Sequence, residues 1–329
     1  MSRPIFAADV GSRNTRYAFS EGAGCEPTLI AAAPSERRRG ELRVTALGRG
    51  VRCFAEPCAA PVREGMAADT ELLALFLAAL AKIKMRRRNL KGTELCCALS
   101  GVMPPIRRLA YKKAAEAAGF GGFCEVDASL MGAIGAGLDV FSGSAVMIAD
   151  IGAQTLRCAV IANGGLLFES MDRFGSDCID RAIMYYFRRE HRALIGARCA
   201  EIIKQQLERE EFLIDGRSAE DGLPRSVRCT CAELRECAEA AAKPIVRFIA
   251  DAFAAVSPEA AADVAENGLV LIGGGARQLG LGSLLERELL LPVRVAENAE
   301  SAVADGLREA VIGNKKAYER LDASAAAPL

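Results

Sequence analysis

Two stretches of the chain, AADVGSRNTRYAFSEG at 7–22 and IADIGAQTLRCAVIANGG at 148–165, repeat one pattern. In each, an apolar run ends on an aspartate, a glycine stands two residues later, a threonine follows shortly after, and a second apolar run leads to a Gly turn. Asp9 and Asp150 are roughly 140 residues apart, about one domain length. A strand, a tight turn and a second strand, repeated at this spacing, predict two similar α/β lobes with one cleft between them.

Hydrophobic periodicity extends this repeat along the chain. Asp69 is expected to cap a buried helix, and Pro244 is expected to kink a long one. The residues 222–234 have the turn and the alternation of a hairpin. Strands are expected at 5–8, 15–19, 41–48, 94–101, 123–126, 144–150, 156–162, 164–170 and 292–297, and helices at 70–84, 107–119, 129–138, 178–191, 198–211, 232–256 and 301–312.

Composition excludes several classes of protein. With 329 residues, 51% of them hydrophobic, the chain can bury a large core. Its 42 basic residues balance 42 acidic ones, so no overall field favours nucleic acid as a partner. The twelve cysteines lack zinc-ligand spacing and His191 is the single histidine. No signal peptide is recognisable, and the apolar run 72–81 is about half of a membrane span, which predicts a cytoplasmic protein with reduced cysteines.

The two turns have the chemistry of anion sites. A glycine lets backbone N–H groups approach an anion closely, and a Thr or Ser hydroxyl adds a donor. Asp9 and Asp150 cannot touch a phosphate directly, but they can hold a hydrated Mg²⁺ that bridges phosphate oxygens. The alternative for each turn alone is a tight hairpin in which Asp and Gly are simply turn formers.

A third glycine cluster stands in GLVLIGGGARQLG, residues 268–280. It is not a dinucleotide fingerprint, because Gln278 stands where the third glycine is required. Consecutive glycines between a buried strand and a helix let a flat ring or a ribose lie against the backbone. The alternative is an ordinary strand-to-helix turn.

These three elements, in this order, resemble the actin, chaperone-ATPase and sugar-kinase superfamily. The closest resemblance is to the MreB family of bacterial actin homologues, and it extends over about residues 4–312. The stretches that carry it are DVGSRNT, PVREGMAAD, MGAIGAGL, ADIGAQT, RFGSDCIDRAI, LIGARCAEIIK, GLVLIGGGA and SAVADGL.

The resemblance implies an α/β fold of duplicated, ribonuclease-H-like lobes, actin-like, with four subdomains around a cleft for ATP and Mg²⁺. The first lobe would comprise 1–136 with a small insertion at about 28–70. The second would comprise 137–304 with an insertion at about 177–240, and 305–329 would return to the first lobe as a helix and tail.

Carried over position by position, the resemblance also implies the site. Asp9 and Asp150 would be on the metal side, and 274–277 would lie under the adenosine. The implied nucleotide-binding residues are Asp9, Gly11, Ser12, Arg13, Asn14, Thr15, Asp150, Gly152, Ala153, Gln154, Thr155, Gly175, Lys204, Gln206, Gly273, Gly274, Gly275, Ala276 and Arg277.

The sequence departs from the family at the positions that matter for hydrolysis. Ala153 and Gln154 replace two glycines of the second turn. The family's Glu-Glu-Pro, whose second Glu acts on the attacking water, is here Asp127, Ala128 and Ser129. Losing a general base costs about 10² to 10⁴ in rate, so a weak ATPase is expected unless Asp127 acts as the catalytic residue.

Two further departures concern charge and the ribose. The stretch KQQLERE keeps Lys204 but offers Gln206 in place of an acid, and a glutamine can still accept a ribose hydroxyl. Arg13 could offset phosphate charge, whereas Arg16 is expected to be a solvated strand residue.

Membrane attachment in the family can use a short apolar loop, which corresponds here to RRRNLKG at 86–92. Arg86, Arg87 and Arg88 could sit on anionic headgroups with Leu90 inserted. The alternative is a soluble basic loop. The implied location is the cytoplasm, peripheral to the inner face of the membrane, and the implied partners are other copies of the chain and membrane-bound shape and wall-synthesis proteins.

Three functions follow from the resemblance. The first is a nucleotide-dependent filament former that directs cell shape and peptidoglycan synthesis. The second is a paralogue that binds ATP but barely hydrolyses it, acting as a scaffold or a copolymer. A small-molecule kinase would need a catalytic Asp aimed at a substrate hydroxyl, and the sequence offers no convincing candidate. A chaperone is not expected, because no substrate domain follows residue 312.

Overall fold

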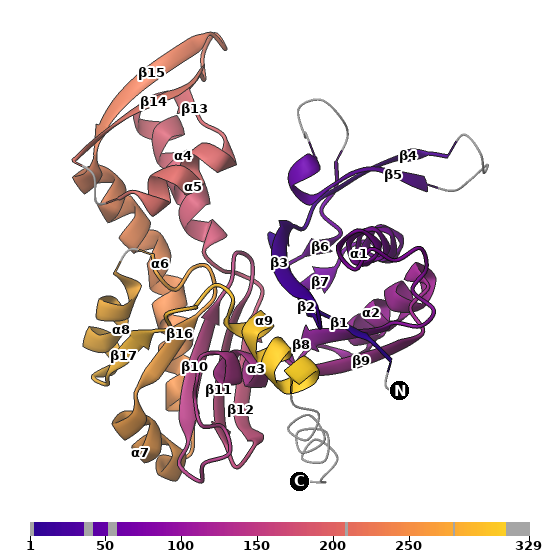
Figure 1. The fold of residues 1–329 in the computed structure, drawn as a ribbon. Helices are drawn as coiled ribbons and strands as arrows, with labels where there is room; N and C mark the ends of the chain where they lie inside the picture. Colours follow the sequence, from indigo (N-terminus) through magenta and orange to yellow (C-terminus); the bar gives the residue numbers. More distant parts are fainter. Residues whose placement is uncertain (1–2, 36–41, 52–57, 208–209, 279, 314–329) are drawn as a thin grey trace.

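The structure, a computed structural model, describes residues 3–35, 42–51, 58–207, 210–278 and 280–313. Two lobes stand side by side, each built on a five-stranded sheet with helices packed against it (Figure 1). The indigo and purple elements form the first lobe, and most of the magenta and orange elements form the second. The prediction of duplicated α/β lobes is confirmed.

The sheet of the first lobe has the order β3-β2-β1-β8-β9. Its first three strands are antiparallel neighbours, and β8 and β9 run parallel to β1. Side chains alternate between the two faces of β1, so Phe6 and Ala8 enter one core and Ala7 enters the other. The strands are β1 (Ile5–Val10), β2 (Asn14–Phe19), β3 (Gly22–Pro27), β8 (Glu94–Leu99) and β9 (Gly122–Asp127).

Helices α1 (Thr70–Lys84) and α2 (Pro105–Ala118) pack together on the face of this sheet that carries Phe6. Asp69 starts α1 as predicted, because its carboxylate accepts the N–H groups of Glu71 and Leu72 at 2.9 and 3.0 Å. Gly119, with φ at 84°, ends α2 in the left-handed conformation that glycine adopts freely.

The sheet of the second lobe repeats the first, in the order β12-β11-β10-β16-β17. Strands β10, β11 and β12 are antiparallel neighbours, and β16 and β17 continue the sheet in parallel with β10. Every residue of β10 is buried. The strands are β10 (Val146–Ile151), β11 (Leu156–Ala162), β12 (Gly165–Asp172), β16 (Leu269–Ile272) and β17 (Val293–Val295).

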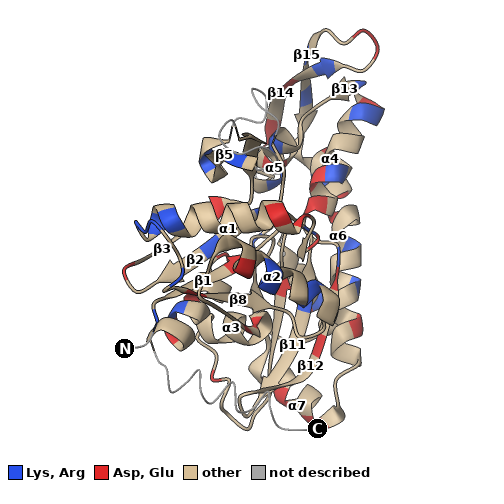
Figure 2. Ribbon diagram, turned by 90° about the vertical axis from the view of Figure 1, so that its right-hand side faces the viewer, with Lys and Arg blue, Asp and Glu red and all other residues tan. Residues whose placement is uncertain are grey.

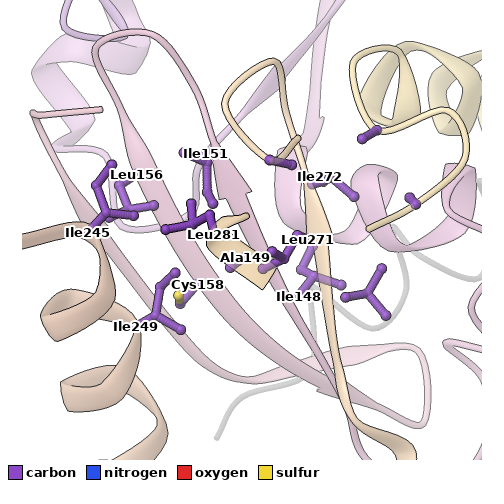
Figure 3. Packing of buried hydrophobic residues seen from close by; sticks show 14 of the residues in the cluster. Ile148, Ala149, Ile151, Leu156, Cys158, Ile245, Ile249, Leu271, Ile272 and Leu281 are labelled. Atoms are coloured by element: carbon purple, nitrogen blue, oxygen red, sulfur yellow. The ribbon is translucent and has the colours of Figure 1, made fainter. Parts of the chain in front are cut away.

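The core of the second lobe holds α6 against this sheet. Figure 3 shows Ile245 and Ile249 of α6 beside Leu156 and Cys158 of β11. Burying one side chain of the size of Ile or Leu is worth about 1.5–3 kcal/mol, so this contact fixes the helix to the sheet. The helices of this lobe are α4 (Asp177–Glu190), α5 (Ala197–Gln205), α6 (Cys231–Ala254), α7 (Pro258–Asn267) and α8 (Leu281–Leu289).

Smaller elements extend both lobes above the sheets (Figure 1). In the first lobe they fall within 28–70, and in the second within 177–240. Of the hairpin expected over 222–234, only β15 lies in that range; its partner strand is the earlier β14, and α6 already begins at Cys231. The elements are β4 (Ile30–Pro34), β5 (Leu42–Leu47), the 3₁₀ turn η1 (Gly48–Gly50), β6 (Val62–Arg63), β7 (Met66–Ala67), β13 (Ala193–Leu194), β14 (Glu211–Ser218) and β15 (Pro224–Thr230).

The lobes meet where α3 (Ala128–Gly135) crosses α9 (Ala302–Gly306). A Cβ at Gly135 would collide with the carbonyl oxygen of Ala302, and a Cβ at Gly306 would collide with that of Met131. Glycine is required at both positions, because the two backbones touch directly. The π-helical segment η2 (Leu307–Gly313) then continues to β1 and β2 of the first lobe.

Two of the expected helices differ in the structure. The helix expected over 198–211 ends at Gln205, and Glu211 already belongs to β14. The single helix expected over 301–312 is α9 followed by a π-helical segment. Residues 314–329, which the sequence assigns to a helix and tail, lie outside the described residues.

Candidate functional site

A cavity of about 170 Å³ lies between the lobes, where the β1–β2 turn faces the β10–β11 turn. The glycine turn that follows β16 forms part of its wall. Most of the predicted nucleotide site is brought together here. The predicted residues on its lining are Asp9, Gly11, Ser12, Arg13, Asn14, Asp150, Gly152, Ala153, Gln154, Thr155, Lys204, Gly273 and Gly274.

Both turns close with one backbone hydrogen bond, from Gly11 to the carbonyl of Asn14 at 3.1 Å and from Gly152 to that of Thr155 at 2.9 Å. A Cβ at Gly11 would lie 2.7 Å from the Asn14 oxygen, and one at Gly152 would lie 2.8 Å from the Thr155 hydroxyl. Only glycine allows turns this tight, which explains its place two residues after each aspartate.

Thr15 does not line the cavity. The structural equivalent of Thr155 is Asn14, so the first threonine stands one residue further along its strand. Because successive side chains of a strand point to opposite faces, this offset turns Thr15 into the interior. It is fully buried there, and its hydroxyl shares a hydrogen bond with that of Thr28 at 2.9 Å.

In the glycine cluster after β16, some residues line the cavity and others pack behind it. Gly273, with φ at 87°, donates its N–H to Ala299, and Gly275 donates to the Ile151 carbonyl at 2.8 Å. Gly275 therefore packs against the second turn, and neither it nor the buried Ala276 lines the cavity. Arg277 donates to the carbonyls of Ala296 and Glu297 and is also absent from the lining.

Gly175 supports the second turn from behind. A Cβ there would lie 2.5 Å from the Gly152 oxygen and 2.8 Å from that of Ala153. The next residue, Ser176, donates its N–H to the Gly152 carbonyl and lines the cavity. Gly175 therefore contributes indirectly, because its missing Cβ lets the backbone of the second turn lie close to it.

Helix α5 contributes residues other than those expected. Lys204 is buried and forms an ion pair with Asp180 at 2.7 Å. Glu201 and Gln205 line the cavity, whereas Gln206 lines a separate hollow beside β14. The prediction for Gln206 is wrong for this reason, and helical spacing from Lys204 could have indicated Glu201, one turn earlier.

Arg13 crosses the cleft from the first lobe to the second. Its guanidinium forms ion pairs with Asp177 at 2.7 Å, Asp180 at 3.2 Å and Glu201 at 2.5 Å. Its side chain is only 32% exposed, so this network is partly shielded from water. In this structure Arg13 therefore ties the first turn to α4 and α5.

Arg157 is a further cavity residue that the sequence patterns did not indicate. It stands directly opposite Asp150 across β10 and β11, and its Nη2 donates to Asp150 Oδ2 in an ion pair. Burial works against its charge, but Asp150, Asp9 and Asp127 outweigh burial and raise the pKa of the guanidinium. It is a permanent buried cation among three carboxyl groups.

The corresponding pair of the first lobe has a different arrangement. Arg16 stands opposite Asp9 in the strand register, but its ion pair is with Glu300 at 3.6 Å. Burial raises the pKa of Asp9, while the charges of Arg157 and Arg16 oppose that shift. Arg16 lines the cavity, so it is not the solvated strand residue expected from the sequence.

The positive charge of Arg157 beside Asp9 and Asp150 determines whether these residues can hold magnesium. Two like unit charges 4 Å apart repel by about 4 kcal/mol at an effective dielectric constant near 20, and Mg²⁺ carries twice the charge. The predicted hydrated Mg²⁺ between Asp9 and Asp150 does not fit a donor set that already contains Arg157.

Asp127 lies outside the cavity lining and serves as the N-cap of α3. Its two oxygens accept the N–H groups of Leu130 at 2.9 Å and Gly101 at 3.0 Å. Burial, and then the charge of Glu169, raise its pKa to about 6. Both oxygens are engaged in the fold, and Ala128 beside it is fully buried without an acid group.

The basic loop 86–92 agrees with only part of its prediction. Arg86, Arg87 and Arg88 are exposed. Leu90 is 1% exposed within the first-lobe core, so the expectation that it inserts into a membrane is wrong for this conformation. No helix in the described ranges is both long and apolar enough to cross a bilayer. Figure 2 shows basic and acidic residues interspersed along α4 and α6.

Comparisons with known proteins agree on one family. The model of the MreB/Mbl protein family matches residues 7–319. The cell shape-determining protein Mbl of Bacillus subtilis is 33% identical over 259 residues, covering 75% of this chain and 76% of that protein. The crystal structure of MreB5 of Spiroplasma citri bound to AMPPNP aligns with a TM-score of 0.85 at 23% identity, covering 98% of this chain and 99% of that one. The MamK double helical filament aligns with a TM-score of 0.72 at 18% identity, covering 99% and 100%.

Proposed function

Because the chain belongs to the MreB/Mbl family of actin-like proteins, we propose that it binds a nucleotide in the cavity between its lobes and assembles into filaments. These filaments lie at the inner face of the membrane and direct cell shape and wall synthesis. The observation that carries the proposal is the convergence of the two duplicated turns and the glycine turn after β16 on one cavity.

Each part of the cavity has a role toward a nucleotide. Backbone at the turns of Gly11 and Gly152 can approach phosphate oxygens, because no Cβ blocks it. Gly274 leaves open space in which a flat adenine can lie, since a Cβ there would meet nothing within 4 Å. Lys204 and Arg13 supply positive charge beside the phosphates.

The cavity must widen to admit the ligand. Its volume of about 170 Å³ is below the roughly 300–1,000 Å³ of sites for small molecules. The ion pairs of Arg13 with Asp177, Asp180 and Glu201 hold the lobes across this space. Nucleotide entry therefore exchanges these carboxylates for phosphate as the partner of Arg13.

Blocking the floor of the cavity tests nucleotide binding. Gly274→Tyr fills the space beside the glycine turn without meeting other atoms at its Cβ, and calorimetry should register no ATP or ADP binding. Gly92→Tyr is the matched control, because its Cβ also meets nothing within 4 Å and it lies outside the cavity lining. Equal affinity in the two variants would contradict the site.

Sedimentation tests the filament. The full chain should pellet with ATP and pellet less without nucleotide, and Gly274→Tyr should resemble the nucleotide-free protein. A chain that stays in the supernatant under every nucleotide condition would remove the filament from the proposal.

Attachment to the membrane is supported by the exposed Arg86, Arg87 and Arg88. Each can contribute about 1 kcal/mol on an anionic surface. The protein should float with anionic vesicles and not with neutral ones, and changing the three arginines to serine should abolish flotation. Undiminished flotation of that variant would place attachment elsewhere.

A second candidate function is that of a scaffold or copolymer that binds the nucleotide but hydrolyses it very slowly. It is favoured by Asp127, whose two oxygens are held by backbone N–H groups, and by Ala128 at the position of the family's glutamate. Phosphate release followed during sedimentation separates the two functions. Pelleting with negligible phosphate supports the scaffold, and steady release supports an active ATPase.

A further inference from the structure

We propose that the Arg157 guanidinium takes the place of a divalent cation in this cleft, so that a nucleoside diphosphate or triphosphate binds without magnesium. The inference rests on the proposed nucleotide site and concerns what neutralises the phosphates there.

The position of Arg157 carries the proposal. The residue projects from β11 on the same face as Asp150 of β10, and its side chain is 12% exposed and lines the cavity. It interacts electrostatically with Asp9 and Asp127, at the ends of two first-lobe strands. One cation therefore serves acids from both lobes at the point where the two turns meet.

The guanidinium keeps a donor for a ligand. Its Nε is buried, and within the described residues it has no hydrogen-bond partner. A buried N–H without a partner is costly, so this atom is an unmet donor beside the second turn. Arginine presents its N–H groups as a rigid fork that matches phosphate oxygens, so the group can hold Asp150 and a phosphate together.

The hairpin architecture alone does not produce this arrangement. Arg16 occupies the same cross-strand position in the first lobe, yet its ion pair is with Glu300, whose side chain is 66% exposed. Arg157 instead pairs with Asp150, whose side chain is 10% exposed. The buried cation is therefore a property of the second lobe, where Mg²⁺ would have to displace a charge that cannot be deprotonated.

Titration calorimetry of the full chain with ADP, once in EDTA and once in excess Mg²⁺, tests the inference. We expect dissociation constants that agree within about threefold, a difference below 1 kcal/mol. A loss of affinity greater than about tenfold in EDTA overturns the inference and leaves the proposed nucleotide site intact. Absence of binding in both solutions overturns both.

Variants identify the residue responsible. Arg157→Gln should lose at least about tenfold in ADP affinity in EDTA and recover most of it in Mg²⁺, because Asp9 and Asp150 are then free to hold hydrated metal. Arg16→Gln, the matched change in the first lobe, should alter affinity equally in both solutions. If the ratio of the ADP dissociation constants in EDTA and in Mg²⁺ were the same for Arg157→Gln as for the wild-type protein, Arg157 would not be the residue that replaces the metal.

A conservative variant guards against misfolding. Arg157→Lys keeps a cation beside Asp150 and should keep metal-independent binding, with melting curves recorded for all variants. Mn²⁺ binding measured by electron paramagnetic resonance gives a second readout, since the wild-type protein with ADP should hold Mn²⁺ no more tightly than free ADP does. Tighter Mn²⁺ binding by the wild-type complex would contradict the proposal.

Discussion

The turn of the first lobe and the turn of the second close with the same backbone hydrogen bond, yet their arginines behave differently. The side chain of Arg13 extends from the first turn to acidic residues of the second lobe, and Arg16 forms an ion pair with Glu300 near α9. Arg157 stays on its own sheet beside Asp150. The repeated sequence pattern thus determines the backbone of the two turns, whereas the neighbouring elements determine which acid each arginine pairs with.

The largest expected effect comes from removing the buried cation. Arg157→Leu leaves Asp150 without its partner and should cost about 3–5 kcal/mol of the free energy of unfolding. Arg16→Leu in the first lobe should cost less than about 1 kcal/mol, because its partner is exposed. Urea denaturation measures both, and equal costs would break the comparison. The double change Arg157→Leu with Asp150→Asn should recover part of the loss.

A smaller effect is expected at the glycine turn that supports only the second hairpin. Gly273→Ala forces φ of 87° on a residue with a Cβ and crowds the Asp150 carboxylate and the Ile151 oxygen, so it should cost about 1–3 kcal/mol. Gly274→Ala is the control, because its Cβ meets nothing within 4 Å. Thermal unfolding of the two variants measures the difference in stability. If Gly273→Ala unfolds at the same temperature as Gly274→Ala, the glycine turn after β16 does not support the second turn.

Arg13→Ala tests whether the first turn reaches across the cleft in solution. Loss of its partly shielded ion pairs should cost about 1–2 kcal/mol and let the lobes separate. Small-angle scattering should report a larger radius of gyration, and high salt should produce the same shift in the wild-type protein. Arg13→Lys is the control that keeps the charge. Unchanged scattering of the Ala variant would mean that other contacts close the cleft.

The smallest effect concerns the pH dependence of stability that arises from Asp127, a carboxyl group on which the charge of Arg157 also acts. The pKa of Asp127, about 6 in the fold, is raised from 3.8, so its contribution to stability is greatest below the lower value and is lost as pH rises through about 6. Asp127→Asn keeps an N-cap without this titration, and should flatten the dependence by on the order of 1 kcal/mol between acid and neutral pH. Urea denaturation of this variant and of the wild-type protein at several pH values checks the difference.

The sequence predicts both hairpins and the glycine turn because their signals are local. Gly11 and Gly152 stand where a tight turn excludes a Cβ, and apolar runs on either side read as buried strands. The order of these elements is enough to predict two lobes and one cavity.

Side-chain partners were harder to predict because they depend on register and on other elements. A one-residue offset moved Thr15 from the cavity to the core. Helical spacing from Lys204 could have indicated Glu201, whereas the buried ion pair of Arg157 with Asp150 depends on how the second lobe packs around that strand pair. Leu90 lies in a basic loop, but it packs into the first-lobe core, a contact that arises only in the folded chain.

The crossing of α3 and α9 determines how the protein can move. At Gly135 and Gly306 the helices touch backbone to backbone, so neither can slide without collision, and rotation is the motion left to them. Such a close contact can act as a pivot for a relative rotation of the two lobes. A small rotation about this crossing would move β4 and β14, which lie far from it, more than it moves the cavity between the lobes (Figure 1).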